Sequence, residues 1–349
     1  MAEKVLMKGN EAIAEGAIAA GCQCFFGYPI TPQNEVPEHM SKRMIELGRV
    51  FLQAESEVAA INMVYGAAGA GARVMTSSSS PGISLKQEGI SYIATAELPA
   101  VIVNVQRGGP GLGGLCPSQS DYFQATKGGG HGDYHLIVLA PSSVQELYDM
   151  VGDAFDLADK YRNPAMLLTD AVIGQMMEPV ELKERKVPNV DKSWATTGHQ
   201  GKRKHNIVNS LGLAWDELAE MNKRLYDKYE TIKANEVRIE EQNVNDADLV
   251  VIAYGSSSRV AKSAIALARA NGVKVGLLRP ITLWPFPSKR VAELAARGKK
   301  FLVVEMSFGQ MYEDVKLAVD GKAPVDLLYK LNGTVPSVEE VQQRIESLK

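Results

Sequence analysis

A short segment near the start of the chain places one hydroxyl between two prolines. Tyr28-Pro29-Ile30-Thr31-Pro32 follows an apolar run. Proline fixes its own φ and restricts the residue before it, so the Thr31 hydroxyl is held in a narrow range of directions. Such a hydroxyl can bind a carboxylate or a carbonyl oxygen, whereas a purely structural turn is the alternative for these five residues.

A carboxylate opens the next informative segment. Glu57 begins a long run of small residues that reads as a helix, and Glu55 lies two positions earlier. A carboxylate at a helix start is commonly a cap or a partner of the helix dipole. A buried carboxylate there would have a raised proton affinity and could act as an acid/base partner. Glu57 is the main candidate for this role, and Glu55 is the weaker one.

An arginine follows directly after a continuous apolar run. Arg107 precedes Gly108-Gly109-Pro110, and glycines allow a ligand to approach the backbone closely. Arginine can bind a carboxylate through two parallel hydrogen bonds, which suits an anionic substrate. A surface ion pair is the alternative. The chain has no P-loop spacing and no His/Asp/Glu spacing typical of a metal site, so no metal ligand is predicted.

These residues must be positioned by the alternating strands and helices around them. The predicted strands cover residues 22–27, 50–54, 73–76, 99–106, 136–141 and 165–170. With helices between them they predict a doubly wound parallel sheet, in which 165–170 is the last strand. Ligands bind at the carboxyl ends of such strands. The segments that fall there are Tyr28–Pro32, Ser77–Gly82 and Arg107–Pro110, and the serines Ser77–Ser80 are predicted as a flexible polar loop.

The second half of the chain predicts a connector followed by another α/β unit. From about Lys183 to Asn206 the sequence is polar, and an amphipathic helix with one apolar stripe follows. The stripe consists of Leu218, Met221, Leu225, Tyr229 and Ile232. Its packing against its own domains and a subunit contact both remain open. The further strands are predicted at 249–254, 273–278 and 300–304, with a tight turn at Gly255–Ser258. Ser143 and Glu146 are spaced as a capping box at a helix start.

Composition narrows the function classes. The chain has 349 residues with a net charge of −3, which gives no electrostatic case for nucleic-acid binding. No cleavable signal segment and no membrane-spanning apolar stretch is recognised, which predicts a cytoplasmic protein without membrane contact. The three cysteines, Cys22, Cys24 and Cys116, predict neither a disulfide framework nor an iron–sulfur cluster on this chain.

Three motifs together resemble a known family. They are Gly27–Pro32, Arg107–Pro110 followed by Pro117–Asp121, and Leu278–Pro287. The chain resembles, over essentially its whole length, the alpha subunit of the multi-subunit 2-oxoacid:ferredoxin oxidoreductases, which depend on thiamine diphosphate. Residues 119–133 look most like the branch that acts on the branched-chain substrate 3-methyl-2-oxobutanoate. The 2-oxoglutarate enzymes are a close alternative.

The resemblance implies an architecture and a role for each candidate residue. It implies a pyrimidine-type thiamine diphosphate domain over residues 1–182, a linker with the amphipathic helix over 183–245, and a transketolase C-terminal-like domain over 246–349. Glu57 matches the carboxylate that activates the cofactor through N1′ of its aminopyrimidine. Tyr28, Pro29 and Ile30 fall with it in the cofactor site. Thr31 and Arg107 match the positions that hold the substrate.

The resemblance also implies that this chain is one part of a complex. A beta subunit would share the thiamine diphosphate, and Mg²⁺ and the iron–sulfur clusters would lie on partner subunits. A gamma subunit and a ferredoxin-like delta subunit complete the expected complex, coenzyme A is the co-substrate and ferredoxin accepts the electrons. Leu115-Cys116-Pro117 stands where many 2-oxoglutarate-type relatives carry a threonine, which favours a branched aliphatic substrate.

Two readings of other classes remain open at this stage. In one, the chain is a non-catalytic scaffold subunit. In the other, it is a transketolase-like enzyme that needs no redox partner.

Overall fold

The first sheet has seven strands, six of them parallel, and carries the amino-terminal half of the protein. A computed structural model describes residues 4–348. The strands are β2 (Cys24–Gly27), β3 (Val50–Gln53), β4 (Val74–Ser78), β5 (Val101–Gln106), β6 (Ile137–Leu139), β7 (Ala165–Asp170) and β12 (Thr282–Trp284). Their order is β12-β6-β7-β5-β4-β2-β3. Every residue of β5 is buried, as its run without alternation predicts for a strand covered on both faces.

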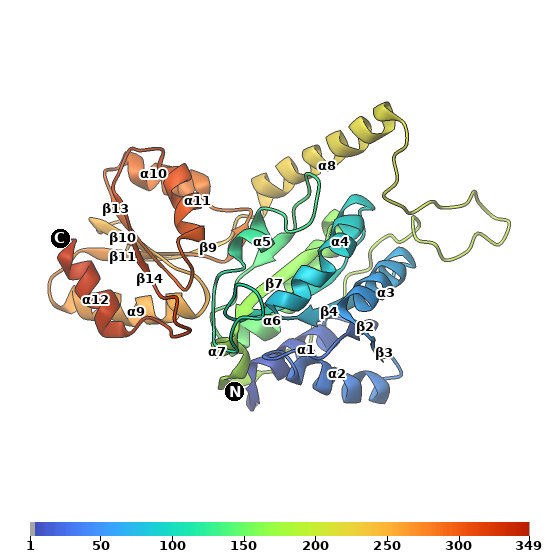
Figure 1. Cartoon of the computed structure of the whole chain (residues 1–349), viewed down its shortest axis with the longest axis horizontal. Coiled ribbons are helices and arrows are strands. Elements are labelled where there is room, and N and C mark those ends of the chain that lie inside the picture. The colour runs from blue at the N-terminus through green and yellow to red at the C-terminus, as the bar shows by residue number, and fades with distance from the viewer. Residues whose placement is uncertain (1–3, 349) are drawn as a thin grey trace.

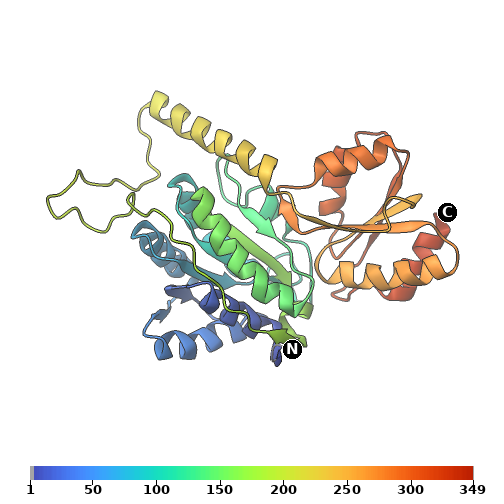
Figure 2. The same ribbon diagram turned by 180° about the vertical axis from the view of Figure 1, so that it is seen from behind.

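Helices cover both faces of this sheet, which confirms the doubly wound prediction. They are α1 (Gly9–Ala19), α2 (Glu35–Glu46), α3 (Glu57–Gly69), α4 (Ser80–Thr95), α5 (Tyr122–Thr126), α6 (Val144–Tyr161) and α7 (Ala171–Gln175). Figure 1 shows α3 and α4 in front of the sheet, and Figure 2, seen from behind, shows α6 on the opposite face. α1 packs against α6 on that second face.

The serine run after β4 is not the flexible loop that the sequence predicts. Ser77 and Ser78 are part of β4, and Ser80 already belongs to α4, whose first turn contains Pro81. All four serines from Ser77 to Ser80 are buried. The helix starts early because proline is well suited to the first helical position, where its missing N–H has no partner to lose.

The seven-stranded sheet does not end at β7. The strand β12, from the carboxyl-terminal half of the chain, pairs antiparallel with β6 and forms the edge. The prediction that Ala165–Asp170 is the last strand of this sheet is therefore wrong. Three residues beside two prolines give no strand pattern of their own, so the sequence holds no local signal for β12.

The carboxyl-terminal half forms a second sheet of five strands. The strands are β9 (Ile239–Gln242), β10 (Leu249–Ile252), β11 (Val275–Pro280), β13 (Lys300–Glu305) and β14 (Val325–Tyr329), in the order β14-β13-β10-β11-β9. Its helices are α9 (Gly255–Ala270), α10 (Ser288–Ala296), α11 (Gln310–Val319) and α12 (Val338–Ser347). The segment Gly255–Ser258, predicted as a tight turn, is the first turn of α9.

Two smaller features complete the fold. β1 (Lys4–Lys8) and β8 (Met177–Glu181) pair antiparallel as a separate ribbon.

The predicted amphipathic helix is α8 (Trp215–Asn235), of which Leu225, Tyr229 and Ile232 are buried while Leu218 is exposed. Its apolar stripe therefore packs on its own chain only at the carboxyl-terminal end. Among residues 4–348, no helix combines the length and apolar character that crossing a bilayer requires.

The predicted capping box at α6 forms only in part. Ser143 caps the helix by accepting a hydrogen bond from the Glu146 backbone N–H. The Glu146 carboxylate binds Ser142 and forms an ion pair with Arg279 of β11 instead of returning to the cap. Arg279 is almost fully buried, so its pairing with Glu146 ties the two sheets together.

Candidate functional site

The three segments that the sequence places at strand ends meet at one edge of the first sheet. β5, β4 and β2 are neighbours in the sheet, so the segments that follow them lie side by side. Gln33 Oε1, after β2, accepts a hydrogen bond from Ser77 Oγ of β4 at 2.5 Å. Ser80 Oγ, at the start of α4, accepts from the Arg107 backbone N–H at 3.1 Å. The predicted convergence of these segments is thus present in the structure.

The segment from Tyr28 to Pro32 is anchored through the Pro32 carbonyl and is otherwise mostly exposed. The Pro32 carbonyl accepts hydrogen bonds from the side-chain amides of Asn10 and Gln175, at 2.8 and 2.9 Å. Pro32 is buried, whereas Tyr28, Pro29 and Thr31 are exposed and Ile30 is half-buried. The Thr31 hydroxyl accepts a long hydrogen bond from Asn34 Nδ2, at 3.4 Å. The hydroxyl therefore lies at the surface of this chain, where a ligand or another subunit can reach it.

Arg107 links this segment to the segment after β5. Its Nη1 donates to the Thr31 carbonyl at 2.9 Å and its Nη2 donates to the Leu112 carbonyl at 3.1 Å. The side chain is buried, and its Nε has no hydrogen-bond partner among residues 4–348. No carboxylate pairs with Arg107 in this part of the chain, so the alternative of a surface ion pair does not hold.

Glu57 is the first residue of α3 and is 6% exposed. The helix is capped by Ser56, whose Oγ accepts from the Ala59 N–H at 3.1 Å, so the Glu57 carboxylate is not needed as the cap. Among residues 4–348, its carboxylate forms no hydrogen bond and no ion pair. The side chain is largely buried but its oxygens are not fully enclosed, so the carboxylate is accessible to a group from outside this chain.

A glycine makes room for the Glu57 carboxylate. A Cβ added to Gly82 of α4 would lie 2.6 Å from Glu57 Oε1 and closer still to Ser78 Oγ. The carboxylate therefore lies against the bare backbone at the start of α4. Only glycine permits this approach, because any side chain at position 82 would collide with the carboxylate.

The structure joins some of the predicted site residues and leaves others apart. Arg107 donates a hydrogen bond to the Thr31 backbone carbonyl. The Glu57 carboxylate lies against the start of the neighbouring α4. No hydrogen bond links Glu57 to Arg107 or Thr31 within the described part of the chain. Glu55, the weaker candidate, is exposed. The site roles of Glu57, Thr31 and Arg107 therefore remain predictions.

The sequence does not predict one buried titratable residue near Glu57. Lys86 of α4 is fully buried, and its Nζ donates to Thr76 Oγ1 at 2.6 Å. Burial lowers the pKa of Lys86 to about 7, and the nearby Glu57 charge opposes this shift. Lys86 lies between a leucine and a glutamine in a helix with polar neighbours, which reads as a solvated face. Its amine lies against β4, where it donates to Thr76 and to the Ser77 carbonyl, and α3 packs on the same helix.

We expect the buried Lys86 to make stability depend on pH. Its pKa of about 7 in the folded protein lies below the ordinary 10.5. The unfolded chain therefore binds more protons between these values, and the free energy of unfolding rises with pH across that window. Lys86→Met removes this dependence, so its stability relative to wild type should be highest below neutral pH and fall by about 3 kcal/mol between pH 6 and pH 9, at about 1.36 kcal/mol per pH unit above the folded-state pKa.

Thermal unfolding of both proteins at about pH 6 and about pH 9 measures this effect. Lys42→Met, at an exposed position of α2, is the matched control and should differ from wild type by the same amount at both pH values. A difference between Lys86→Met and wild type that does not change with pH would contradict the assignment.

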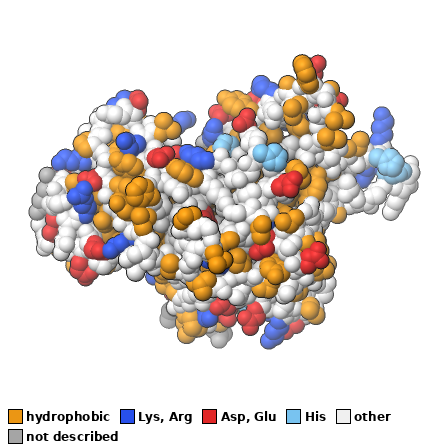
Figure 3. Space-filling model, in the orientation of Figure 1, with side chains coloured by type: hydrophobic (Ala, Val, Ile, Leu, Met, Phe, Trp, Pro, Cys, Tyr) orange, Lys and Arg blue, Asp and Glu red, His pale blue; other side chains and the backbone are white. Residues whose placement is uncertain are grey.

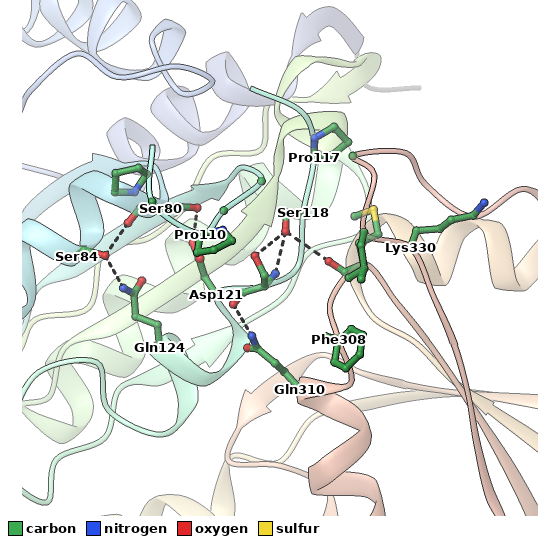
Figure 4. Close-up of a pocket in the computed structure, with 18 residues that line it drawn as sticks. Ser80, Ser84, Pro110, Pro117, Ser118, Asp121, Gln124, Phe308, Gln310 and Lys330 are labelled. Carbon is green, nitrogen blue, oxygen red and sulfur yellow. Dashed lines mark hydrogen bonds between the residues drawn. The ribbon is translucent and has the colours of Figure 1, made fainter. Parts of the chain in front are cut away.

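A cavity of about 680 Å³ lies beside this edge, between the two halves of the chain (Figure 4). On one side it is lined by Ser80, Ser84, Asp121 and Gln124, and on the other by Phe308, Gln310 and Lys330, among other residues. Gln310 Nε2 crosses between the halves and donates to the Ser120 carbonyl at 2.7 Å.

Glu57, Thr31 and Arg107 do not line this cavity, although Ser80 and Gly108 border both places. Burial raises the pKa of Asp121, and hydrogen bonds from Ser80 and Asn104 oppose the increase. Because Glu57 does not line this cavity, the edge of the sheet that carries Glu57 is not enclosed by this chain alone.

The residues present fit the ring end of a thiamine cofactor. The unpartnered Glu57 carboxylate above Gly82 can receive a protonated ring nitrogen. Among residues 4–348, no group of three or more His, Cys, Asp or Glu side chains could hold a metal ion.

Family comparisons cover most of the sequence. Residues 15–242 match the model described as pyruvate flavodoxin/ferredoxin oxidoreductase, thiamine diphosphate-binding. Residues 247–341 match the model described as pyruvate:ferredoxin oxidoreductase core domain II.

Two relatives from Methanothermobacter marburgensis align with nearly the full chain. The chain is 57% identical to ketoisovalerate oxidoreductase subunit VorB, over 98% of this chain and 97% of the relative. It is 39% identical to 2-oxoglutarate synthase subunit KorA, over 100% of both chains. Identity is thus clearly higher to the relative named for ketoisovalerate.

Solved structures share the fold. A 2-oxoglutarate:ferredoxin oxidoreductase from Magnetococcus marinus, with 2-oxoglutarate, coenzyme A and succinyl-CoA bound, matches with a TM-score of 0.88 and 26% identity. The match covers 99% of this chain, which spans 65% of the length of that one. A split-gene transketolase matches over 98% of this chain and 97% of its own, with a TM-score of 0.62 and 12% identity. The latter likeness shows the fold alone, and it agrees with the predicted transketolase-like architecture.

Proposed function

Since the chain belongs to the family of 2-oxoacid:ferredoxin oxidoreductase subunits, we propose that it is the alpha subunit of an enzyme for branched-chain 2-oxoacids. The reaction is the oxidative decarboxylation of 3-methyl-2-oxobutanoate with coenzyme A, which gives acyl-CoA, CO₂ and reduced ferredoxin. The observation that carries the catalytic role is the buried Glu57 carboxylate, which has no partner among residues 4–348. The identity of 57% to the ketoisovalerate subunit, against 39% to the 2-oxoglutarate subunit, supports the substrate class.

In this proposal Glu57 holds the ring end of thiamine diphosphate. The bound cofactor supplies the carbon nucleophile and the electron sink that decarboxylation of a 2-oxoacid requires. The Glu57 carboxylate would hold N1′ of the bound aminopyrimidine and could serve as its acid/base partner. Gly82 fixes where the carboxylate lies, and the exposed Tyr28–Ile30 segment forms the side of the same site.

Arg107 and Thr31 are proposed to hold the substrate. The guanidinium of Arg107 is held by two backbone carbonyls, and its Nε remains without a partner among residues 4–348. A charged group so fixed can bind the carboxylate of a 2-oxoacid without reorganising. The Thr31 hydroxyl, on the segment that Arg107 holds, is suited to the adjacent oxygen. Leu112 and Leu115 are exposed apolar side chains on the loop above Arg107, which favours an aliphatic substrate.

The other half of the site is proposed to come from a beta subunit. Glu57 is the one charged residue of α3, and Val58, Asn62, Gly66 and Ala70 are exposed along the helix. An uncharged exposed helix beside an unpaired carboxylate is suited to cover by another polypeptide. The beta subunit would bind the diphosphate and Mg²⁺. The iron–sulfur clusters would lie on partner subunits, among them gamma and ferredoxin-like delta subunits, and soluble ferredoxin would receive the electrons in the cytoplasm.

A panel of 2-oxoacids on the co-purified complex tests this function, with reduction of a viologen dye as the readout. We expect kcat/KM for 3-methyl-2-oxobutanoate to exceed that for 2-oxoglutarate by about tenfold or more, because a second carboxylate in an aliphatic pocket is costly to desolvate. Turnover should require both an electron acceptor and coenzyme A.

The alternatives predict other outcomes. Faster turnover of 2-oxoglutarate would assign the chain to the 2-oxoglutarate enzymes, to which it is also related. Turnover without an electron acceptor would favour the transketolase-like reading and contradict the redox function.

A further inference from the structure

Lys86 of α4 is a charged side chain that no step of the proposed function uses. It is fully buried, and its Nζ donates to Thr76 Oγ1 at 2.6 Å and to the Ser77 carbonyl at 3.4 Å. Both acceptors belong to β4 and are uncharged. An ammonium group enclosed by protein is unfavourable unless an opposite charge lies near it, so the position of Lys86 requires a partner.

Glu57 is the carboxylate near Lys86. The helices α3 and α4 pack against each other, and Glu57 Oε1 lies 2.6 Å from the position that a Cβ on Gly82 would take. Gly82 and Lys86 are four residues apart in α4, so they lie on the same face of the helix, one turn from each other. Burial lowers the pKa of Lys86 to about 7, and the Glu57 charge acts against this shift. The two charges therefore interact through space, since no hydrogen bond joins them within residues 4–348.

The other charged groups around α4 do not contribute to the lowered pKa of Lys86. Among the described residues, burial and Glu57 are its two causes. Glu88, on α4 itself, is exposed and accepts a hydrogen bond from Tyr92 Oη at 2.6 Å. The strands β4 and β5 contain no charged residue. The other titratable side chains on segments packed against α4 are Tyr65 of α3, Arg107 and Asp121 after β5, and His131, Asp133 and Tyr134 before β6.

Hydrogen bonds also connect Lys86 with the segment from Tyr28 to Pro32. Ser77, whose carbonyl accepts from Lys86, donates from its Oγ to Gln33 Oε1 at 2.5 Å, and Gln33 Nε2 donates to the Tyr28 carbonyl at 3.2 Å. The surface over α3 and α4 shows hydrophobic and acidic side chains (Figure 3). Lys86 adds no charge to that surface because it is fully buried, so its ammonium group can act only on residues inside the protein.

We propose that Lys86 is a positioning residue for Glu57, and that its ammonium group keeps the Glu57 carboxylate ionised at the place where it meets the cofactor ring. This inference rests on the proposed function, in which Glu57 is the acid/base partner of thiamine diphosphate. A positive charge nearby favours the ionised form of a carboxylate. Because the pKa of Lys86 is about 7, this support is present below neutral pH and is lost as the pH rises above it.

The pH profile of Lys86→Met in the co-purified complex tests this role. We expect the low-pH limb of kcat to move to higher pH by about one unit, while kcat at about pH 9 stays within about twofold of wild type. Unfolding would not produce this pattern, because the stability of Lys86→Met relative to wild type is expected to be highest below neutral pH. Ile93→Ala, at a buried position of α4, is the matched control for lost packing and should leave the limb in place. An unmoved limb in Lys86→Met would overturn the proposal.

A double-mutant cycle tests the interaction of the two charges without the cofactor. Lys86→Met, Glu57→Gln and the double variant of the purified full chain are unfolded in urea at about pH 6 and about pH 9. We expect the two changes to be non-additive at the lower pH, by about fivefold or more in the equilibrium constant for unfolding, and additive within about twofold at the higher pH. The control cycle replaces Glu57→Gln with Glu55→Gln, at an exposed position, and should be additive at both pH values.

The cycle separates this inference from the proposed function. Additive effects of Lys86→Met and Glu57→Gln at the lower pH would overturn the inference and leave the proposed role of Glu57 in place. Non-additive effects together with a fully active Glu57→Gln complex would overturn the proposed function of Glu57, and with it the role of Lys86 in turnover.

Discussion

Replacing Glu57 with glutamine is expected to lower turnover of the assembled complex by about 10²- to 10⁴-fold, the range that a positioned acid/base group contributes. The amide has the same shape as the carboxylate but cannot exchange a proton with a bound ring nitrogen. Ser56, not Glu57, caps α3, so the helix should survive the change. Acceptor reduction and release of CO₂ measure turnover, and size-exclusion chromatography measures assembly.

Glu55→Gln is the matched control for this experiment. Glu55 lies two residues earlier in the same segment but is exposed, so its loss should leave turnover close to wild type. A scaffold role for the chain predicts that Glu57→Gln is as active as Glu55→Gln. That result would remove Glu57 from the catalytic site and leave the family membership untouched.

The second large effect is expected at Gly82. A Cβ there would lie 2.6 Å from Glu57 Oε1, which is closer than two such atoms can approach. Gly82→Ala should therefore push the carboxylate out of place, and displacement of a catalytic group by about 1 Å can cost about 10²-fold in rate. Turnover should fall while the carboxylate itself is retained, and the concentration of thiamine diphosphate needed for half-maximal activity should rise.

Gly66→Ala provides the comparison. Gly66 is in α3, and a Cβ at this position would meet no atom within 4 Å. Within this chain the change should be neutral or slightly stabilising, because alanine favours a helix more than glycine does. Gly66 lies on the face proposed to meet the beta subunit, so turnover of this variant is compared per assembled complex, with assembly measured by size-exclusion chromatography. Full activity of Gly82→Ala, with an intact complex, would mean that the Glu57 carboxylate does not need its observed position.

Much of the first sheet could be predicted because its strands are continuous apolar runs. β5 shows this best, since all six of its residues are buried and Arg107 follows at its end. The meeting of the segments after β2, β4 and β5 could be predicted for the same reason: strand ends of a parallel sheet share an edge. The sequence predicts a loop where β4 ends and α4 begins, because a run of four serines is typical of loops, whereas in the structure Ser77 and Ser78 belong to β4 and Ser80 to α4.

Features that depend on contacts between distant segments gave no local signal. Lys86 is buried where α4 packs on the sheet, with its amine bound to Thr76 of β4, so its lowered pKa depends on tertiary packing that the local sequence does not show. The Glu146 carboxylate binds Arg279, 133 residues away, and does not complete the predicted capping box, because a buried guanidinium must be paired. The substrate roles of Thr31 and Arg107 rest on the family resemblance, and the geometry adds that the two are joined through a backbone carbonyl.

The antiparallel strand β12 restricts movement of the two halves of the chain relative to each other. Because a piece of the carboxyl-terminal half completes the amino-terminal sheet, a hinge motion between the halves would have to break strand hydrogen bonds. Gln119 strengthens this connection, since its side chain binds Tyr254 and Ser257 across the boundary. The protein should therefore behave as one rigid body during turnover. Opening and closing over the Glu57 edge would then be the task of the neighbouring subunits, not of bending within this chain.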